Sequence, residues 1–508
     1  MFPVFKPAKF LLMACATGIP VFAEAQFSLD AQLRTRTEWR NGTGTLRSYG
    51  ADPSFFTSQR TRLIAQYQQS RLQFKLSLQD VRVWGQDASG ITVADGARLG
   101  VHEAWAELVL ANNNDSAFKH SAIDRFSIRI GRQELLYDDA RLLGNLDWLQ
   151  QGRRHDALVL KLKEKKFSVD AGFAFSQNTD AFGYNGTYYT PANVQPSVRD
   201  SKGNLVLTPS GIIPLVNAGN ISVRNGSLAL VNPAGTNGQT MQYKAMQFVH
   251  GTYKNNHSVL SAMFLADHFG KHQFDSVQNI SGTDTGYIYG KRFKTKGLYS
   301  RITAGLQLSG AFDKQGSWHY KAGAYYQAGK DREGVSLAAY MLYASLTHQR
   351  GSLSYYIGYD LLSGNDAFGS NTKNYRFDPL YGTPHKFWGY MDYFYVGTGS
   401  PAGGLSNPQA GIRYAAKKIS AALDYHAFLL ANDQAGKGGA KLDPYLGSEL
   451  DLSGVYQLSN AVSLEGGLSM LRATRSMEYA KNISPGTASL NASWAWLMVN
   501  IRPNLLKR

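Results

Sequence analysis

Apolar and polar residues alternate along most of the chain after Gln26. From Phe27 to Trp39, the odd positions carry Phe, Leu, Ala, Thr or Trp, and the even positions carry charged or amide residues with one serine. Successive side chains of a β-strand point to opposite faces, so this period of two predicts a strand with one apolar and one charged face. The pattern recurs at 72–79, 167–175, 301–309, 318–327 and 462–470.

The links between these segments alternate in length. Short links lie at 69–71, 164–166, 254–257, 312–317, 349–352, 416–418 and 458–461. Long links rich in glycine and asparagine lie at 41–57, 85–100, 134–152, 178–241, 270–298, 361–404, 431–445 and 472–488. Short periplasmic turns and long extracellular loops are typical of outer-membrane barrels. The sequence therefore predicts an all-β protein, a single transmembrane antiparallel β-barrel.

The number of strands depends on one aromatic segment, HKFWGYMDYFY at 385–395. If this segment is a strand, the total is odd. Single-chain bacterial barrels have an even number of strands and both termini on one side, so we place the segment in a long loop and expect about 18 strands. A wall of about this size leaves room for an aqueous lumen, so inward side chains are solvated.

The first 25 residues have the order of a secretory signal peptide. Lys6 and Lys9 precede an apolar stretch, Phe10 to Phe22, which ends in Ala-Glu-Ala at 23–25. Such segments are removed from the mature protein, so we expect residues 26–508 to form one barrel domain.

The only cysteine, Cys15, lies within this N-terminal segment. Leu12-Met13-Ala14-Cys15 also resembles a lipoprotein box, which is the alternative in which Cys15 carries a lipid anchor. If cleavage follows Ala25, the mature chain has no disulfide, thiolate metal site or cysteine nucleophile.

Net charge and hydropathy narrow the possible partners. The formal net charge is +16, and no apolar run approaches the ~20 residues of a spanning helix. In an exported protein this charge favours anionic lipid headgroups or an anionic solute as partner. We therefore expect outer-membrane lipids around the protein and no nucleic acid.

Enzyme and metal motifs are absent from the sequence. There is no G-x-S-x-G, H-E-x-x-H or Walker loop, and His102-Glu103 is not followed by a second His at helical spacing. The histidines are scattered, so we expect no metal site and no cofactor. A Ser–His–carboxylate set brought together from different strands is the remaining enzymatic alternative. We expect a protein that is not an enzyme.

Charged residues recur on the predicted inner wall and its adjoining loops. The candidates for the solute path are Arg34, Arg36, Arg40, Arg60, Arg62, Asp80, Arg82, Arg129, Arg132, Arg141, Arg153, Arg154, Asp156, Arg301, Lys321 and Arg413. Basic residues crowd the first three strands and acidic residues gather in later ones, which predicts a polarised lumen. A basic lumen lowers the barrier for anions and raises it for cations. The simpler interpretation is that these side chains only pair with one another across the wall.

Aromatic residues form two predicted groups. The outward group, expected at the membrane interfaces, is Trp39, Trp318, Tyr320, Tyr326, Trp494 and Trp496. The second group lies in the loop at 375–395, which has too many aromatic residues for free solvation. We expect this loop to pack as a plug or lid, and the alternative is that it stacks on sugar rings.

Several blocks of the sequence resemble the alginate-export family of outer-membrane proteins. These blocks are GRQELLYDDARLLGNLDWLQQGRRHDAL (131–158), QDVRVWG (79–85), GYDLLSGND (358–366), DPLYGTPHKFWGYMDYF (378–394) and LGSELDL (446–452). The resemblance implies a monomeric barrel with an electropositive channel, related to the porin that exports alginate. It also implies arginines at a constriction, in RTRTEWR (34–40), SQRTR (58–62), DVR (80–82) and GRQE (131–134).

The sequence thus predicts a passive outer-membrane channel for an anionic polysaccharide, such as an alginate-like polyuronate, or for smaller anionic solutes. Inner-wall Arg and Lys would replace part of the hydration shell of a carboxylate, and scattered Asp and Glu would prevent trapping. The alternatives are a generic uptake porin without polymer specificity and an outer-membrane enzyme. The charges of 131–162 are expected at the rim and inner wall, where they hold an extracellular loop near the channel mouth.

Overall fold

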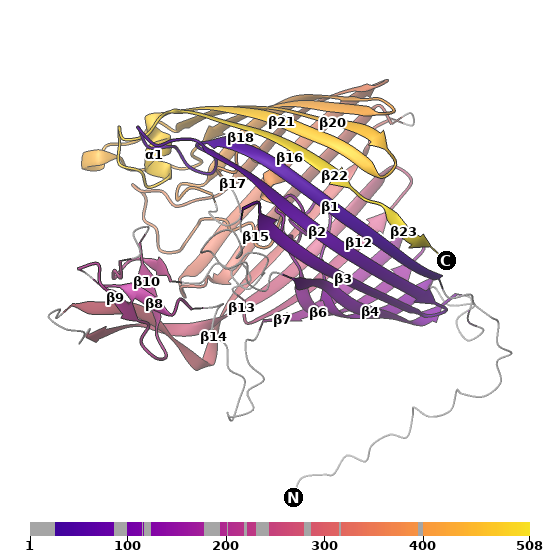
Figure 1. Ribbon diagram of the computed structural model, residues 1–508, viewed down its shortest axis with the longest axis horizontal. Helices are drawn as coiled ribbons and strands as arrows, with labels where there is room; N and C mark the ends of the chain where they lie inside the picture. Colours follow the sequence, from indigo (N-terminus) through magenta and orange to yellow (C-terminus); the bar gives the residue numbers. More distant parts are fainter. Residues whose placement is uncertain are drawn as a thin grey trace, which may run out of the picture.

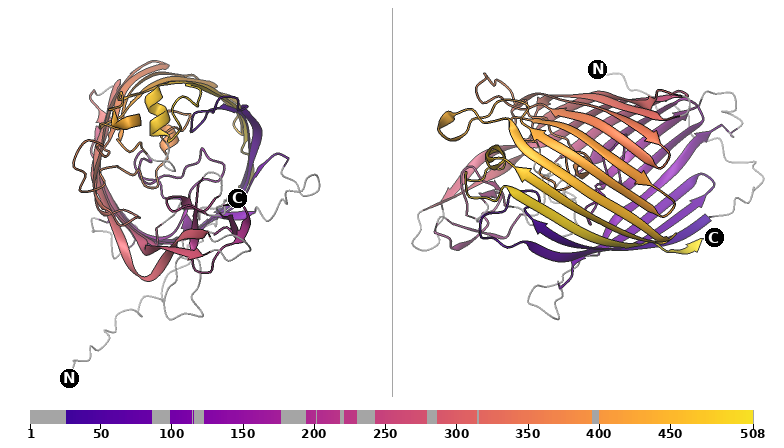
Figure 2. Two further views of the ribbon diagram at one scale, coloured as in Figure 1. Left: turned by 90° about the vertical axis from the view of Figure 1, so that its left-hand side faces the viewer. Right: turned by 90° about the horizontal axis from the view of Figure 1, so that it is seen from above.

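The described part of the chain forms one closed barrel. The computed structural model describes residues 26–85, 99–113, 115, 123–176, 194–200, 202–217, 221–229, 243–278, 286–313, 316–394 and 400–507. Within these residues, 18 antiparallel strands form the wall. The wall closes on itself (Figures 1 and 2). The expected signal peptide, with Cys15, lies outside the described residues.

The wall strands follow one another around the barrel in chain order. The strands before the longest link are β1 (Gln26–Asn41), β2 (Ser54–Gln69), β3 (Leu72–Val83), β4 (Gly100–Asn112), β5 (Arg125–Gln133), β6 (His155–Glu164) and β7 (Phe167–Phe175). The strands after it are β12 (Ala245–Lys254), β13 (Ser258–Gln278), β14 (Tyr287–Ala311), β15 (Trp318–Lys330), β16 (Ser336–Arg350), β17 (Leu353–Leu362), β18 (Leu405–Ala415), β19 (Ile419–Leu429), β20 (Tyr445–Ser459), β21 (Val462–Ala473) and β22 (Asn491–Ile501).

Three pairings complete the ring. β7 pairs with β12 across the longest link, and β22 pairs with β1. β23 (Asn504–Lys507) continues along the start of β1, so both ends of the described chain lie at the same end of the barrel (Figure 1). The short turns lie at this end, which is therefore the periplasmic end.

Smaller elements gather at the opposite, extracellular end. The link between β7 and β12 contains β8 (Ser197–Arg199), β9 (Leu205–Leu207), β10 (Ile213–Val216) and β11 (Ser227–Leu228), and β10 pairs with β14. The short helices are η1 (Pro384–Lys386), η2 (Lys437–Gly439) and α1 (Arg475–Ala480). Among the described residues, no helix has the length and apolar character needed to cross a membrane.

The two faces of the wall differ in polarity. On β1, Leu33 and Trp39 are each 37% exposed on the outside, whereas Arg34 and Arg36 face inward and are each 3% exposed. Many other wall strands also expose apolar side chains outward, among them Leu72, Phe74, Ile130, Phe173, Phe264, Leu306, Leu342, Ile357, Leu450, Leu468 and Leu497. Such a continuous apolar belt is stable in lipid and unfavourable in water. The protein is therefore an outer-membrane β-barrel.

The strand count and the assignment of 385–394 to a loop are confirmed, and one predicted link is wrong. Residues 270–298 were expected to form a loop, but β13 and β14 continue to pair as far as Gln278 and Tyr287. Continued backbone pairing stabilises this part of the two strands, which extends beyond the barrel rim. Figure 1 shows this long hairpin beside β8–β10.

Two of the predicted outward aromatics point inward. Trp494 and Trp496 share the parity of Asn500, whose side chain bonds to inward Gln32, while Leu497 faces lipid. Trp494 is buried and donates to Glu38. The alternation of β22 thus overrides the usual preference of tryptophan for the membrane interface. Trp39, Trp318 and Tyr326 do face outward.

Candidate solute path through the barrel

The link between β5 and β6 folds into the barrel. Its residue Asp147 lies against the inner faces of β1 and β2, where three arginines bind it. Arg60 Nη1 lies 2.8 Å from Asp147 Oδ1, Arg34 Nη1 lies 3.2 Å from Oδ2, and Arg62 Nη1 lies 3.3 Å from Oδ1. The charges of 131–162 were expected at the rim and inner wall, and the tip of this link lies on the inner wall, because the arginines of β1 and β2 bind it.

Backbone and aromatic contacts fix the same tip. The carbonyl oxygen of Trp148 accepts from Arg36 at 2.7 Å and from Arg34 at 3.3 Å. The guanidinium of Arg36 also lies 4.2 Å from the centre of the Trp148 ring, which packs edge-on against Trp494 and Trp496. Guanidinium groups bind planar oxygens and aromatic faces together, so this tip is held in one position.

Positive charge exceeds negative charge at this contact. Burial alone would raise the pKa of Asp147, but Arg60 and Arg34 outweigh burial and lower this pKa to about 2. The carboxylate of Glu38 forms ion pairs with Arg36 at 2.9 Å and with Arg40 at 2.8 Å. Only two carboxylates, Asp147 and Glu38, pair with five arginines here, so the paired groups carry a net positive charge. The five are Arg34, Arg36, Arg40, Arg60 and Arg62.

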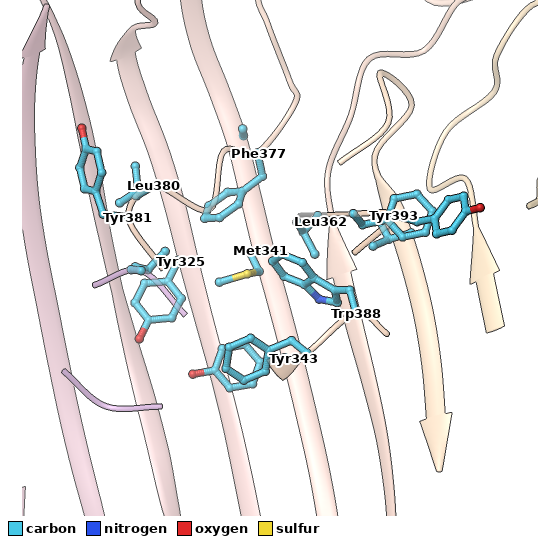
Figure 3. Close-up of a cluster of buried hydrophobic side chains, with 14 of the residues drawn as sticks. Tyr325, Met341, Tyr343, Leu362, Phe377, Leu380, Tyr381, Trp388 and Tyr393 are labelled. Carbon is cyan, nitrogen blue, oxygen red and sulfur yellow. The ribbon is translucent and has the colours of Figure 1, made fainter. Parts of the chain in front are cut away.

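The link between β17 and β18 also folds inward, through its aromatic part at 375–394. Phe377, Tyr381, Trp388, Met391 and Tyr393 are all buried. Figure 3 shows side chains of this segment packed on inward side chains of the wall strands. We call residues 375–394 the aromatic loop. Its packing inside the barrel agrees with the prediction that it packs rather than remaining freely solvated.

Carboxylates of the later strands hold the aromatic loop. Tyr381 donates to Asp267 at 2.7 Å, Trp388 to Asp360 at 3.0 Å, and Tyr390 to Asp424 at 3.1 Å. The backbone N–H groups of Tyr390 and Met391 donate to Asp451 and Glu449 at 3.2 and 2.8 Å. The acidic half of the wall predicted from the sequence exists, and the aromatic loop covers much of it.

Ion pairs join both inserted loops to the wall. Arg141 Nη1 lies 2.8 Å from Asp360, and its Nε lies 3.1 Å from Asp139 of its own loop. Arg301 of β14 pairs with Asp267 at 2.5 Å and with Asp378 of the aromatic loop at 2.6 Å. Burial would raise the pKa of Asp378, but Arg301 and Arg332 lower it to about 2. These buried pairs make the two loops part of the folded wall.

In the remaining inner-wall pairs, the cation reaches farther into the lumen than its carboxylate. The exposed fraction of the side chain is 52% for Arg413 and 2% for Asp424. It is 38% for Arg125 and 3% for Glu107. The same order holds for Lys321 with Asp139, Arg40 with Glu38, Arg129 with Glu107, and Lys75 with Glu103. At these six pairs a dissolved ion therefore meets the cation first, whereas Asp147 and Asp378 are more exposed than the arginines they bind.

Two cavities lie along this charged wall. One of about 360 Å³ is bordered by Arg60, Arg62, Lys75, Arg502 and the carboxylate of Asp147. The other, of about 440 Å³, lies toward the periplasmic turns and is bordered by four cations, Arg125, Arg129, Lys161 and Lys163, and two carboxylates, Glu107 and Asp170. Both have room for a small solute. The second has an excess of cationic side chains, whereas the lining of the first also includes Asp30, Glu103 and Glu134, so its four cations face four carboxylates.

The predicted path residues fall into three groups. On the inner wall lie Arg34, Arg36, Arg40, Arg60, Arg62, Arg129, Arg301, Lys321 and Arg413. In the inserted link lie Arg141, Arg153 and Arg154, and Arg153 donates to the carbonyl of Gly382 at 2.5 Å. The third group faces outward and is a correction: Asp80, Arg82, Arg132 and Asp156.

Parity explains the correction. Asp80 and Arg82 share a face with Leu72 and Phe74 of β3, which are exposed outward. Arg132 follows outward Ile130 by two positions and stands opposite Asp156, with which it pairs at 2.8 Å. Because a step of one residue changes the face of a strand, these charges lie on the outside of the wall.

Four of the predicted arginines converge on the inserted link at Asp147 and Trp148: Arg34, Arg36, Arg60 and Arg62. Arg82 and Arg129 lie elsewhere. Arg82 pairs with Asp80 outside, and Arg129 pairs with Glu107 while stacking 4.0 Å from the Trp105 ring centre.

Sequence reasoning missed Asp147, Lys161 and Arg125 as parts of the site. The parity of Arg125 with Arg129, and of Lys161 with Val159, was a usable signal, whereas no local pattern marked Asp147.

One group of possible metal ligands occurs among the described residues. Ligand atoms of His102, Glu103 and Glu134 lie within 4.8 Å of one another, which the scattered histidine positions did not predict. His102 and Glu134 bond to each other at 2.9 Å, and Glu103 pairs with Lys75. A cation there would have to displace Lys75 and lie beside Arg62, so these residues fit an ion-pair network better than a metal centre.

Comparison with known proteins agrees with the fold. The model of the alginate export family matches residues 25–175, which include β1–β7 and the inserted link between β5 and β6. No curated protein sequence matches the chain.

Solved structures of porins from Pseudomonas aeruginosa are similar over nearly their full length. OccK9 (OpdG) has 15% identity and a TM-score of 0.53, covering 94% of this chain and 98% of that one. OpdL has 13% identity and a TM-score of 0.54, covering 94% and 99%. OpdK, solved with vanillate, has 10% identity and a TM-score of 0.50, covering 95% and 99%. These structures share the barrel fold. The chain thus resembles the alginate export family over residues 25–175 and these outer-membrane proteins in its fold.

Proposed function

We propose that this outer-membrane channel, whose residues 25–175 match the alginate export family, passes small anionic solutes, with carboxylated sugars such as uronates as the substrate class. Transport is passive. Inner-wall Arg and Lys side chains exchange for part of the hydration shell of a passing carboxylate, which lowers the barrier for anions.

The observation that carries this proposal is the geometry of the inner-wall ion pairs. The side chains of Arg413, Arg125, Arg40 and Lys321 are exposed to the lumen, while their carboxylate partners are buried, three of them on the wall and Asp139 on the inserted link. The aromatic loop covers the acidic strands in addition. At these pairs a solute meets the cation before the carboxylate, which supports a preference for anions.

Reconstituted protein in a planar bilayer tests the proposal. Under a salt gradient, we expect a reversal potential that favours chloride over potassium, and higher permeability to glucuronate than to a cation of similar size. Arg413→Gln and Lys321→Gln should reduce this preference. Arg132→Gln, on the outside of the wall, is the matched control and should leave it unchanged. Cation selectivity of the native channel would refute the proposal.

The family match favours a second candidate, a polyuronate as the transported polymer. A polymer needs a wider open path than a small solute does, and the tip at Asp147 and the aromatic loop are both anchored inside the barrel. Vesicles loaded with uronates of increasing chain length separate the two candidates. Efflux that is lost after the first few sugar units supports small solutes, and efflux that persists for long chains supports the polymer.

A further inference from the structure

The cavity of about 440 Å³ lies over the five strands β3–β7, close to the periplasmic turns. Its volume is within the range of small-molecule sites. Its charged lining residues are the cations Arg125, Arg129, Lys161 and Lys163 and the carboxylates Glu107 and Asp170. The described lining therefore carries four positive and two negative charges.

The alternation of β5 and β6 turns these cations toward the lumen. The two arginines of β5 alternate with Ile130, which is 56% exposed on the outside. The two lysines of β6 flank Leu162, which is 38% exposed on the outside. The turn at 165–166 follows directly after Lys163, so the cavity lies beside the periplasmic mouth of the channel.

The two arginines share one carboxylate. Arg125 Nη2 lies 2.7 Å from Glu107 Oε1, and Arg129 Nη2 lies 2.6 Å from Glu107 Oε2. The hydroxyl of Ser127 donates to the same carboxylate at 2.8 Å. A guanidinium group has five N–H donors, and these two arginine side chains are 38% and 23% exposed. Both therefore keep donors that face the lumen.

The second carboxylate, Asp170, is engaged on the other side of the cavity. Tyr137 of the inserted link donates to it at 2.9 Å, and Lys161 Nζ lies 3.7 Å from it. Asp170 therefore balances Lys161 at most, and it forms no ion pair with Lys163.

Lys163 stands opposite a like charge. Its Cα partners are Arg125 on β5 and Ser168 on β7. Side chains directly opposite each other on antiparallel strands have Cβ atoms about 5 Å apart, and like charges there destabilise the sheet. Among the described residues, the ammonium group of Lys163 forms no hydrogen bond or ion pair, the neighbouring Asp124 and Glu164 included. A bound anion between Lys163 and Arg125 would remove this repulsion.

We propose that this cavity binds a doubly charged oxyanion, such as the phosphate monoester of a small sugar, at the periplasmic mouth. A dianion matches the excess of two positive charges, whereas a single carboxylate neutralises half of it. Guanidinium and ammonium groups both bind phosphate oxygens through charge-assisted hydrogen bonds. The inference extends the proposed function to doubly charged solutes and rests on it for the passage of anions through the lumen.

Calorimetric titration of the purified protein in detergent at low ionic strength tests the inference. Glucose 6-phosphate is a dianion at pH 8, because its second pKa is about 6. It should bind saturably, and glucose 6-sulfate, a monoanion of similar shape, should bind about tenfold or more weakly. Lys163→Gln and Arg125→Gln should each weaken glucose 6-phosphate binding by about tenfold or more, through loss of one charge-assisted contact.

Lys166→Gln is the matched control. It removes an exposed cation of the turn between β6 and β7 that does not line the cavity, so its affinity should equal that of the native protein. Lys163→Gln removes a like-charge repulsion, so this variant should fold with an unchanged or slightly higher free energy of unfolding. The conservative Lys163→Arg should retain binding.

Equal affinity for the phosphate and sulfate esters, or unchanged affinity in either cavity variant, would overturn the inference. Reversal potentials separate it from the proposed function. Anion selectivity without a glucose 6-phosphate site would remove the inference and leave the proposed function intact. Cation selectivity together with an intact phosphate site would refute the proposed function and leave the site.

Discussion

Single side chains change how positive the lumen is, and Asp147 is the carboxylate that three arginines share. Asp147→Asn removes the carboxylate shared by Arg34, Arg60 and Arg62. We expect a larger anion preference and a loosened link, because three cations then face neutral acceptors only. Single-channel conductance and reversal potential measure this. Asp156→Asn, in the outer pair with Arg132, should have little effect on selectivity, and an equal shift there would contradict the assignment.

The same carboxylate sets an acid limit for the inserted link. Because the folded-state pKa of Asp147 is lowered to about 2, its stabilising contribution is present above the ordinary value near 4 and is lost as pH falls toward 2. Anchoring of the link should therefore persist at pH 5.

The residues on the inner wall of the first two strands were predictable, because period two in RTRTEWR and SQRTR fixes their face. Asp80 and Asp156 were misplaced since their charge was given more weight than their parity with apolar neighbours. Asp147 was not identifiable as their partner. Its contacts with β1 and β2 join positions about one hundred residues apart, and no local pattern encodes such a pairing.

At the scale of elements, the aromatic loop depends on a close approach at Gly389. This residue has φ +79°, and a Cβ there would meet the carboxylate of Glu449 at 2.6 Å. Gly389→Ala should therefore destabilise the loop by about 1–3 kcal/mol, from left-handed backbone strain and the displaced carboxylate. Limited proteolysis and urea unfolding measure this effect.

Gly438 is the matched control for that substitution. It also has a left-handed φ, +72°, but a Cβ there meets nothing within 4 Å. Gly438→Ala bears only the backbone strain and should cost less. Equal losses for both variants would show that Glu449 does not confine the loop. The sequence indicated that this aromatic segment packs, but its partners on β13, β17, β19 and β20 required the closed barrel.

At the scale of the whole molecule, the strand count followed from alternation and parity because a closed wall leaves no edge and needs both ends on one side. The alternation also predicts where charge is tolerated. Leu342→Lys faces lipid and should lower the free energy of unfolding by about 2–4 kcal/mol near the bilayer midplane. Ser345→Lys, on the inner face of the same strand, should change it by under about 1 kcal/mol. Urea unfolding in vesicles compares the two, and equal losses would contradict the assigned faces.

The inner ion pairs in which the cation is the more exposed partner, such as Arg413 with Asp424 and Arg125 with Glu107, also affect water. Mobile counterions in such a lumen are mainly anions, and they drag solvent when a voltage drives them. The channel should therefore show electro-osmotic flow toward the positive electrode. An uncharged sugar added on the negative side would then cross faster than diffusion alone allows, and reversing the voltage would slow it.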